Sequence, residues 1–208
     1  MAQDLVFYTN PMSRGRIVRW MLEEIGAPYE TKNLNYGAEM KSAAYRAINP
    51  MGKVPAIVHH GVVVTEQAAI CTYLADAFPA AGLAPAPGDP ARGDYYRWLF
   101  FTAGPIEQAV VNHSLGVAIP DDKRGMVGYG SYDLALKTLE QALAGRSHLA
   151  GSRFSAADLY LASHIQWGLM TGTMPDRPAF RAYSEPLLAR PAKVRADGLD
   201  NALVAQAP

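Results

Sequence analysis

The sequence predicts a mixed α/β domain followed by an all-helical domain. Strand and helix signals alternate up to about residue 80, whereas we find no convincing strand signal beyond residue 90. Between the two regions the chain reads PAAGLAPAPGDP, a stretch rich in proline, glycine and alanine that is typical of a linker. We therefore expect a first domain at 1–80, a linker at 81–90 and a helical domain at 91–208.

The first domain is expected to follow the order β-α-β-α-β-β-α. Its strands are predicted at 4–9, at 29–34 and, as a hairpin, within 54–66, and its helices at 13–26, 39–49 and 66–78. His60 and Gly61 separate the two β-branched runs of the hairpin, which is a turn signal. The first helix has apolar residues spaced for one face and a glycine at its end.

The helical domain is predicted to contain one long helix and three shorter ones. The long helix covers 91–116 and is expected to bend near Gly104-Pro105. The others are predicted at 129–145, 155–172 and 178–191, and the segment at 155–172 is apolar enough to be a buried core helix.

Composition excludes several classes of function. Of the 208 residues, Lys plus Arg number 19 and Asp plus Glu number 19, so no basic surface for nucleic acid is expected. No apolar run approaches the ~20 residues that span a bilayer, and we see no signal peptide. With one cysteine, no disulfide forms within the chain, which indicates a cytoplasmic protein. The five histidines show no metal-ligand spacing, so no metal is expected.

Three segments carry candidate chemistry, and the first is FYTNPMSRGR. A strand enters a helix there, with Tyr8, Asn10 and Ser13 at the junction. The Ser13 hydroxyl either caps the helix or faces a bound anion, because a helix N-terminus offers free N–H groups and partial positive charge.

The second segment is NPMGKVPAI, in which Pro55 opens a strand. A cis Val54–Pro55 bond would leave the Val54 N–H and C=O free to pair with a peptide-like molecule. From the fragment alone an ordinary trans bond is favoured, because only about 5–6% of X-Pro bonds are cis.

The third segment is VVVTEQAAI, where a strand gives way to a helix at Thr65, Glu66 and Gln67. The helix N-terminus suits a carboxylate and Glu66 suits an ammonium, so the pair could hold the α-amino acid end of a ligand. The alternative is that Thr65 caps the helix and Glu66 complements its dipole.

Together, in this order and spacing, these segments resemble the cytosolic glutathione transferases, and in particular bacterial, serine-type members. The resemblance covers nearly the whole chain and implies a thioredoxin-like first domain before the helical one. NPMGKVPAI matches the cis-proline segment of the family, and TEQAAICTYLAD matches its glutamate-serine segment, with Gln67 where many members carry serine. SRFSAADLYLA matches the family's capping motif, with Ser155 as N-cap and Asp158 as its partner.

The resemblance also implies a glutathione site, residue by residue. Lys53 would meet the glycine carboxylate, the Val54 backbone beside Pro55 would pair with the cysteinyl part, Glu66 would hold the γ-glutamyl ammonium, and Gln67 would hold its carboxylate. The hydrophobic electrophile is expected between the domains, with candidate walls Met12, Tyr95, Trp98, Phe101, Thr102 and Trp167. A homodimer and a role in detoxification are implied as well, whereas Cys71 is expected to be a small buried hydrophobe.

Thiolate stabilisation explains a hydroxyl at the first junction. Lowering a thiol pKa by about 2 units requires roughly 2–3 kcal/mol. A hydrogen bond to a charged group contributes ~1.5–3 kcal/mol and the helix dipole ~0.3–1. We expect Ser13 to be this donor, because NPMS fits the serine-type pattern. Tyr8 and Asn10 remain alternatives.

The resemblance leaves the reaction itself open. Conjugation of glutathione to hydrophobic electrophiles is the main prediction. The same site could instead reduce peroxides or remove halide, and the fold could serve as a glutathione-binding interaction module without turnover.

Overall fold

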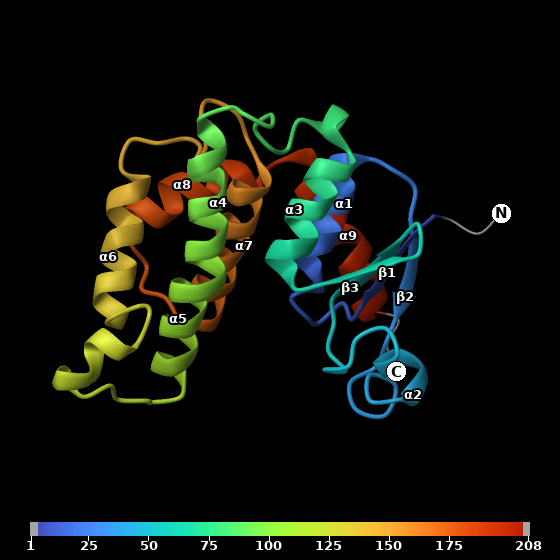
Figure 1. Cartoon of the computed structure of the whole chain (residues 1–208), viewed down its shortest axis with the longest axis horizontal. Helices are drawn as coiled ribbons and strands as arrows, with labels where there is room; N and C mark the ends of the chain where they lie inside the picture. The colour runs from blue at the N-terminus through green and yellow to red at the C-terminus, as the bar shows by residue number, and fades with distance from the viewer. Residues whose placement is uncertain (1–3, 206–208) are drawn as a thin grey trace. The chain divides into compact units, whose positions relative to one another are not determined.

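A computed structural model describes residues 4–205, which form two compact units. The first comprises residues 4–82 and 190–205, and the second comprises residues 83–189 (Figure 1). The first unit contains all four strands of the described chain and the second is helical, so the predicted α/β-then-helical order is confirmed. The outer ends of the predicted domains, 1–3 and 206–208, lie outside the described residues.

The first unit is built on a four-stranded sheet in the order β2-β1-β3-β4. The strands are β1 (Leu5–Thr9), β2 (Glu30–Asn33), β3 (Ala56–His59) and β4 (Val62–Thr65). β1 is parallel to β2 and antiparallel to β3, and β3 is antiparallel to β4. In this register the last residues of β1 and β4 lie beside the first residue of β3. All three strand ends therefore lie along the same edge of the sheet, the one that runs across the strands.

The predicted hairpin is confirmed at His60 and Gly61. Their φ values are 49° and 79°, both positive, as the two central residues of a type I′ turn require. This turn suits the right-handed twist of the flanking strands, and it fixes Ala56 opposite Thr65.

Helices lie on both faces of the sheet. α1 (Gly15–Ile25) packs with α3 (Gln67–Ala77), and the Arg19 guanidinium of α1 lies 5.2 Å from the ring centroid of Phe7. The short α2 (Ala43–Arg46) covers the other face, where the rings of Tyr8 and Tyr45 are 5.7 Å apart. Successive residues of β1 therefore face different helices, as strand geometry demands.

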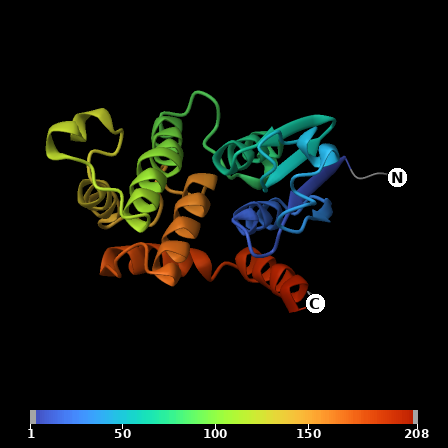
Figure 2. The same ribbon diagram turned by 90° about the horizontal axis from the view of Figure 1, so that it is seen from below.

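The last helix, α9 (Pro191–Ala205), belongs to the first unit, whereas the expected division placed these residues with the helical domain. It packs along α1, as both views show (Figures 1 and 2). No apolar periodicity marks this segment, because the face that packs carries charge: Lys193 and Asp200 are both buried.

The second unit consists of α-helices joined by loops, and the loop between the second and third of them contains a 3-10 helix at Asp121–Met126. The α-helices are α4 (Ala91–Phe101), α5 (Glu107–Ser114), α6 (Tyr132–Leu143), α7 (Ala156–Thr171) and α8 (Pro178–Leu188). A π-helical turn at Thr102–Ile106 joins α4 to α5 and contains Pro105. The segment expected to be one long helix, bent near Gly104-Pro105, is thus two α-helices joined by a π-helical turn at that point.

The capping box of α7 is confirmed and anchors the second unit. The buried Asp158 carboxylate accepts hydrogen bonds from the N–H of Ser155 at 2.8 Å, the N–H of Leu149 at 2.7 Å and the hydroxyl of Tyr183 at 2.7 Å. Burial and this carboxylate raise the pKa of Tyr183 well above its ordinary value, so the hydroxyl stays a donor. The motif serves folding, since every partner belongs to the same unit.

Candidate active site

Sheet topology brings the three predicted segments to one edge of the first unit. Asn10 directly follows β1, Val54 lies just before β3, and Glu66 directly follows β4. A hydrogen bond then ties two of these segments together, because the Gln67 side-chain amide donates to the carbonyl oxygen of Arg14 at 3.1 Å. The strand ends of a sheet of this kind are a common position for ligands.

The Ser13 hydroxyl lies immediately before α1 and makes two local hydrogen bonds. It donates to the carbonyl oxygen of Asn10 at 2.7 Å and accepts from the N–H of Gly15 at 2.9 Å. The N–H of Ser13 also donates to the Asn10 carbonyl at 2.9 Å. That carbonyl therefore keeps a partner if the hydroxyl rotates toward a ligand.

Asn10 organises the loop before α1. The residue is 8% exposed, and its side-chain amide donates to the carbonyl of Leu34 at 2.8 Å and accepts from the N–H of Met12 at 2.9 Å. These bonds hold the end of β1 and the start of the loop in place, which is a scaffolding arrangement.

Tyr8 lies on the α2 face of the sheet. Its ring packs beside Tyr45, whereas its neighbour Phe7 faces α1. The Tyr8 phenol therefore projects away from the helix whose N-terminus follows Ser13.

The Val54–Pro55 peptide bond is cis, which answers the question that the sequence left open. Among the described residues, no hydrogen bond reaches the Val54 N–H or C=O. Both groups are thus open to a ligand that adds like a strand.

Two buried side chains that the sequence analysis missed fix the segment before Pro55. The Tyr45 hydroxyl and the Asn49 amide both donate to the carbonyl oxygen of Lys53, at 2.7 and 2.8 Å. Burial raises the pKa of Tyr45 to about 12, so its hydroxyl remains protonated and donating. No pattern in the sequence links these residues to Lys53, because the bonds end on a backbone atom.

The Lys53 side chain itself is exposed, and the loop around it is held by another lysine. Lys41 donates through Nζ to the carbonyls of Met51 at 3.0 Å and Gly52 at 2.8 Å. Gly52 has φ +58°, and a Cβ there would lie 2.5 Å from the carbonyl oxygen of Met40. The turn before Val54 therefore requires glycine.

Glu66 adopts a rare backbone conformation, with φ 66° and ψ 122°. It is exposed, and among the described residues its carboxylate has no hydrogen-bond or ion-pair partner. Such conformations cost about 1–3 kcal/mol and gather at ligand sites. Thr65 lies within β4 and Glu66 is the N-cap of α3 without a side-chain cap bond, so the alternative in which Thr65 caps this helix is wrong.

The first turn of α3 is open to an anion. The N–H of Ile70 is the first to bond within the helix, to the Glu66 carbonyl at 2.8 Å. The preceding N–H groups have no intrahelical acceptor, and the helix dipole favours negative charge there.

The predicted hydrophobic walls differ in exposure. Tyr95, Trp98 and Thr102 are at most 2% exposed, and the Thr102 hydroxyl donates to the Trp98 carbonyl at 2.8 Å. These three offer almost no surface to a ligand, which corrects their expected role, because apolar helix positions fill the interior first. Met12 is 62% exposed, and Phe101 and Trp167 keep part of their surface.

Cys71 is buried, as expected, and burial raises the pKa of its thiol to about 12. Within residues 4–205, no cluster of His, Cys, Asp or Glu is arranged to hold a metal ion. In the same part of the chain, no helix combines the length and hydropathy that a membrane crossing needs.

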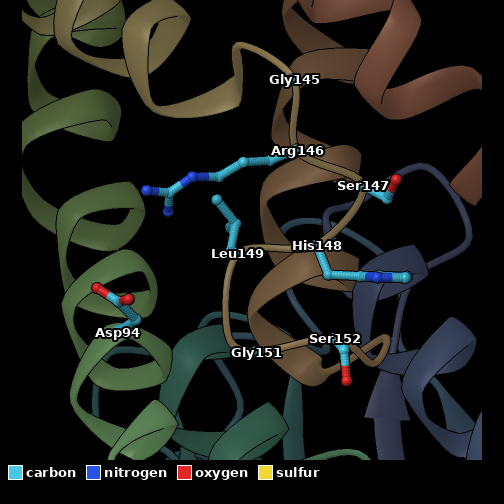
Figure 3. Close-up of a pocket in the computed structure, with 8 residues that line it drawn as sticks. All are labelled: Asp94, Gly145, Arg146, Ser147, His148, Leu149, Gly151 and Ser152. Carbon is cyan, nitrogen blue, oxygen red and sulfur yellow. The ribbon is translucent and has the colours of Figure 1, made fainter.

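A polar hollow of about 550 Å³ lies within the second unit (Figure 3). Arg146 extends from the loop after α6 toward the helix that carries Asp94. The lining residues are Asp94, Gly145, Arg146, Ser147, His148, Leu149, Gly151 and Ser152. None of them is a predicted site residue, so this hollow is not the candidate active site.

Comparison with known proteins identifies the family of this chain. The family model of the glutathione S-transferase N-terminal domain matches residues 12–77, and that of the C-terminal domain matches residues 131–191. Glutathione S-transferase 3 of Zea mays is 31% identical over 90% of this chain and 90% of its own. The chain belongs to the glutathione S-transferase family.

Further relatives agree with this assignment. Glutathione S-transferase GST-4.5 of Xanthomonas campestris is 28% identical over 88% of this chain and 92% of its own. The structure of a sphingomonad glutathione S-transferase complexed with glutathione is 32% identical, with a TM-score of 0.76 over 94% of this chain and 98% of that one. The predicted thioredoxin-like and helical fold and the predicted enzyme class are confirmed: the chain is a glutathione transferase with glutathione as co-substrate.

Proposed function

We propose that this transferase activates the glutathione thiol with the Ser13 hydroxyl and conjugates the sulfur to a hydrophobic electrophile. One observation carries the assignment. The hydroxyl accepts a hydrogen bond from the Gly15 N–H at 2.9 Å, at the start of α1, and its own proton is directed at a carbonyl that has a second donor.

The free energies favour rotation of this hydroxyl. Giving up a neutral hydrogen bond to Asn10 costs about 1 kcal/mol, whereas a bond to a thiolate contributes ~1.5–3 kcal/mol. The N-terminus of α1 adds ~0.3–1 kcal/mol for an anion. The difference corresponds to a thiol pKa lowered by about 1–2 units.

The rest of the sheet edge supplies the tripeptide contacts. The open Val54 N–H and C=O pair with the cysteinyl backbone, and the unpartnered Glu66 carboxylate holds the γ-glutamyl ammonium. The first N–H groups of α3, with Gln67, hold the neighbouring carboxylate, and the exposed Lys53 meets the glycine carboxylate. Met12, which is exposed in the first unit, is the proposed apolar contact of the electrophile.

The reaction is a displacement or an addition at carbon. The thiol proton leaves to solvent, and the thiolate sulfur donates its electron pair to the electrophilic carbon. In a displacement the bond from that carbon to the leaving group breaks, and the leaving group departs with its electron pair. No redox change and no metal enter the step.

We also propose that the enzyme is a cytoplasmic homodimer that detoxifies such electrophiles. The family resemblance supports the dimer, and the single cysteine suits a reducing compartment. Light scattering of the purified protein measures its mass in solution, and a dimer should have twice the mass of the chain.

Turnover of a generic aryl halide with glutathione tests the proposed activity. We expect conjugation by the wild type, about 10–100-fold slower turnover for Ser13→Ala and near wild-type turnover for Tyr8→Phe. Glutathione binding without conjugation of any electrophile, in the wild type, would instead show a binding module.

A further inference from the structure

We propose that Arg16 is a positioning residue that links the C-terminal helix α9 to the loop carrying Ser13, so that the docked helix helps to set the thiol pKa. The inference rests on the proposed role of Ser13. It adds a residue that touches neither glutathione nor the electrophile and acts through the loop.

One guanidinium makes both contacts. Arg16 lies in the first turn of α1, where its Nε donates to the Pro11 carbonyl at 2.7 Å and its Nη2 donates to the Asn201 side-chain oxygen at 2.8 Å. Its Nη1 lies 3.8 Å from an Asp197 carboxylate oxygen. Because the guanidinium is planar and rigid, its fork transmits the position of α9 to the Pro11 carbonyl.

The Pro11 carbonyl lies at the sensitive point of the loop. It stands between Asn10, whose carbonyl receives the Ser13 hydroxyl, and Ser13 itself. Pro11 has no N–H of its own, so this carbonyl is the one backbone hydrogen-bonding group with which the residue can be held. A catalytic hydroxyl needs its position held to within about 0.5 Å, and loss of the Arg16 bond releases the turn that sets it.

α9 is docked by contacts other than Arg16, so it forms a fixed platform. Arg19 pairs with Asp200 at 2.8 Å, both almost fully buried. Arg190, which directly precedes α9, donates to both carboxylate oxygens of Glu24, at 2.6 and 2.8 Å. Substitution of Arg16 therefore removes the link to the loop without releasing the helix.

A matched control lies further along the same pair of helices. Arg195 of α9 pairs with Glu23 near the other end of α1, at 3.3 Å, and both ends of this contact lie away from the loop. Arg195→Gln removes one α1–α9 ion pair, as Arg16→Gln does, but leaves the Pro11 carbonyl bonded. Both variants lose one positive charge, but only Arg16→Gln loses the hydrogen bond to the Pro11 carbonyl.

The test is the pH titration of bound-glutathione thiolate absorbance, with kcat and KM for an aryl halide. We expect Arg16→Gln to raise the thiol pKa by about 0.5–1 unit and to lower kcat at pH 7 by about 3–10-fold, with KM for glutathione within about twofold. Asn201→Ala shifts the pKa in the same direction by less, and Arg195→Gln leaves it unchanged. Thermal unfolding midpoints verify that each variant is folded.

Arg16→Lys distinguishes the effect of the positive charge from the effect of positioning. It keeps the charge but loses the planar guanidinium that bonds to both Pro11 and Asn201. Positioning predicts that Arg16→Lys also raises the thiol pKa. A wild-type pKa in Arg16→Gln, or in both Arg16→Lys and Asn201→Ala, would overturn the inference. A wild-type enzyme that never lowers the thiol pKa would instead overturn the proposed role of Ser13, so the two failures are distinguishable.

Discussion

The hydroxyl of Ser13 points its proton at the carbonyl oxygen of Asn10, 2.7 Å away, in a turn that the Ser13 N–H closes independently at 2.9 Å. The turn therefore survives when the hydroxyl rotates. In the proposed mechanism this hydroxyl has two uses: its proton bonds to the Asn10 carbonyl in the loop, and it turns to the sulfur when glutathione binds.

Replacement of Glu66 by glycine is predicted to stabilise the fold and to weaken glutathione binding. Glycine accepts the positive φ of this position at no steric cost, so Glu66→Gly should raise the free energy of unfolding by about 1 kcal/mol. The variant loses the carboxylate proposed for the γ-glutamyl ammonium, and KM for glutathione should rise by about tenfold or more. Urea unfolding and steady-state kinetics measure the two effects.

His60→Gly is the matched control for this substitution. His60 also has a positive φ, 49°, but lies in the β3–β4 turn at the opposite edge of the sheet from the site. Its stability should rise in the same way, with unchanged KM. Equal effects of both substitutions on KM would contradict the assignment of Glu66.

Gly15 is predicted to tolerate no side chain. A Cβ there would lie 2.0 Å from the Thr9 hydroxyl oxygen, and Thr9 is fully buried. Gly15→Ala should therefore cost about 1–3 kcal/mol of stability through overpacking. Gly198 lies within α9 with nothing within 4 Å of such a Cβ, so Gly198→Ala should stabilise by about 0.5–1 kcal/mol. A neutral Gly15→Ala in thermal unfolding would argue against this packing.

Removal of one anchor of the Lys53 carbonyl is predicted to weaken glutathione binding rather than turnover. Tyr45→Phe deletes the 2.7 Å bond and loosens the Val54 backbone, which should raise KM for glutathione by about 3–10-fold with kcat nearly constant. Tyr29→Phe, which removes a hydroxyl that contacts Arg19 and Glu23, is the control and should leave KM unchanged. An unchanged KM in Tyr45→Phe would show that this anchor is dispensable.

The buried thiol of Cys71 predicts a loss of stability in alkali. The pKa of this thiol is raised from 9.0 to about 12 in the folded protein. Below pH 9 the thiol is neutral in both the folded and the unfolded state, so it does not lower the free energy of unfolding there. Between about pH 9 and 12 only the unfolded state ionises, and this group removes up to about 1.4 kcal/mol per pH unit. Urea unfolding at pH 8 and pH 10.5 should show a smaller fall for Cys71→Ala than for the wild type. Equal falls would contradict the raised pKa.

What the sequence could predict followed local rules. The hairpin at His60-Gly61, the break near Pro105 and the capping box of Ser155 and Asp158 each depend on residues close in the chain, and all three are present. Helix α9 escaped prediction because it packs through charge: Asp200 reaches Arg19 of α1, and no periodicity of apolar residues reports such a pair.

The candidate site shows the same division. The segments that meet at the sheet edge were recognised from their residues, whereas the groups that hold them were not. Asn49 and Arg16 both act on backbone carbonyls, of Lys53 and Pro11, and a bond to a carbonyl leaves no trace in residue type. The buried positions of Tyr95 and Trp98 likewise depend on the packing of whole helices.

The most direct measurement is the thiolate absorbance of bound glutathione as a function of pH, for the wild type, Ser13→Ala and Tyr8→Phe. Ser131→Ala is the control, because Ser131 caps α6 in the helical unit, where its hydroxyl accepts from the Leu134 N–H at 3.2 Å. We predict a wild-type thiol pKa about 1–2 units below the ordinary value of about 8.5, restored in Ser13→Ala alone. Restoration in Tyr8→Phe, with Ser13→Ala unchanged from the wild type, would contradict the account and make this a tyrosine-type enzyme.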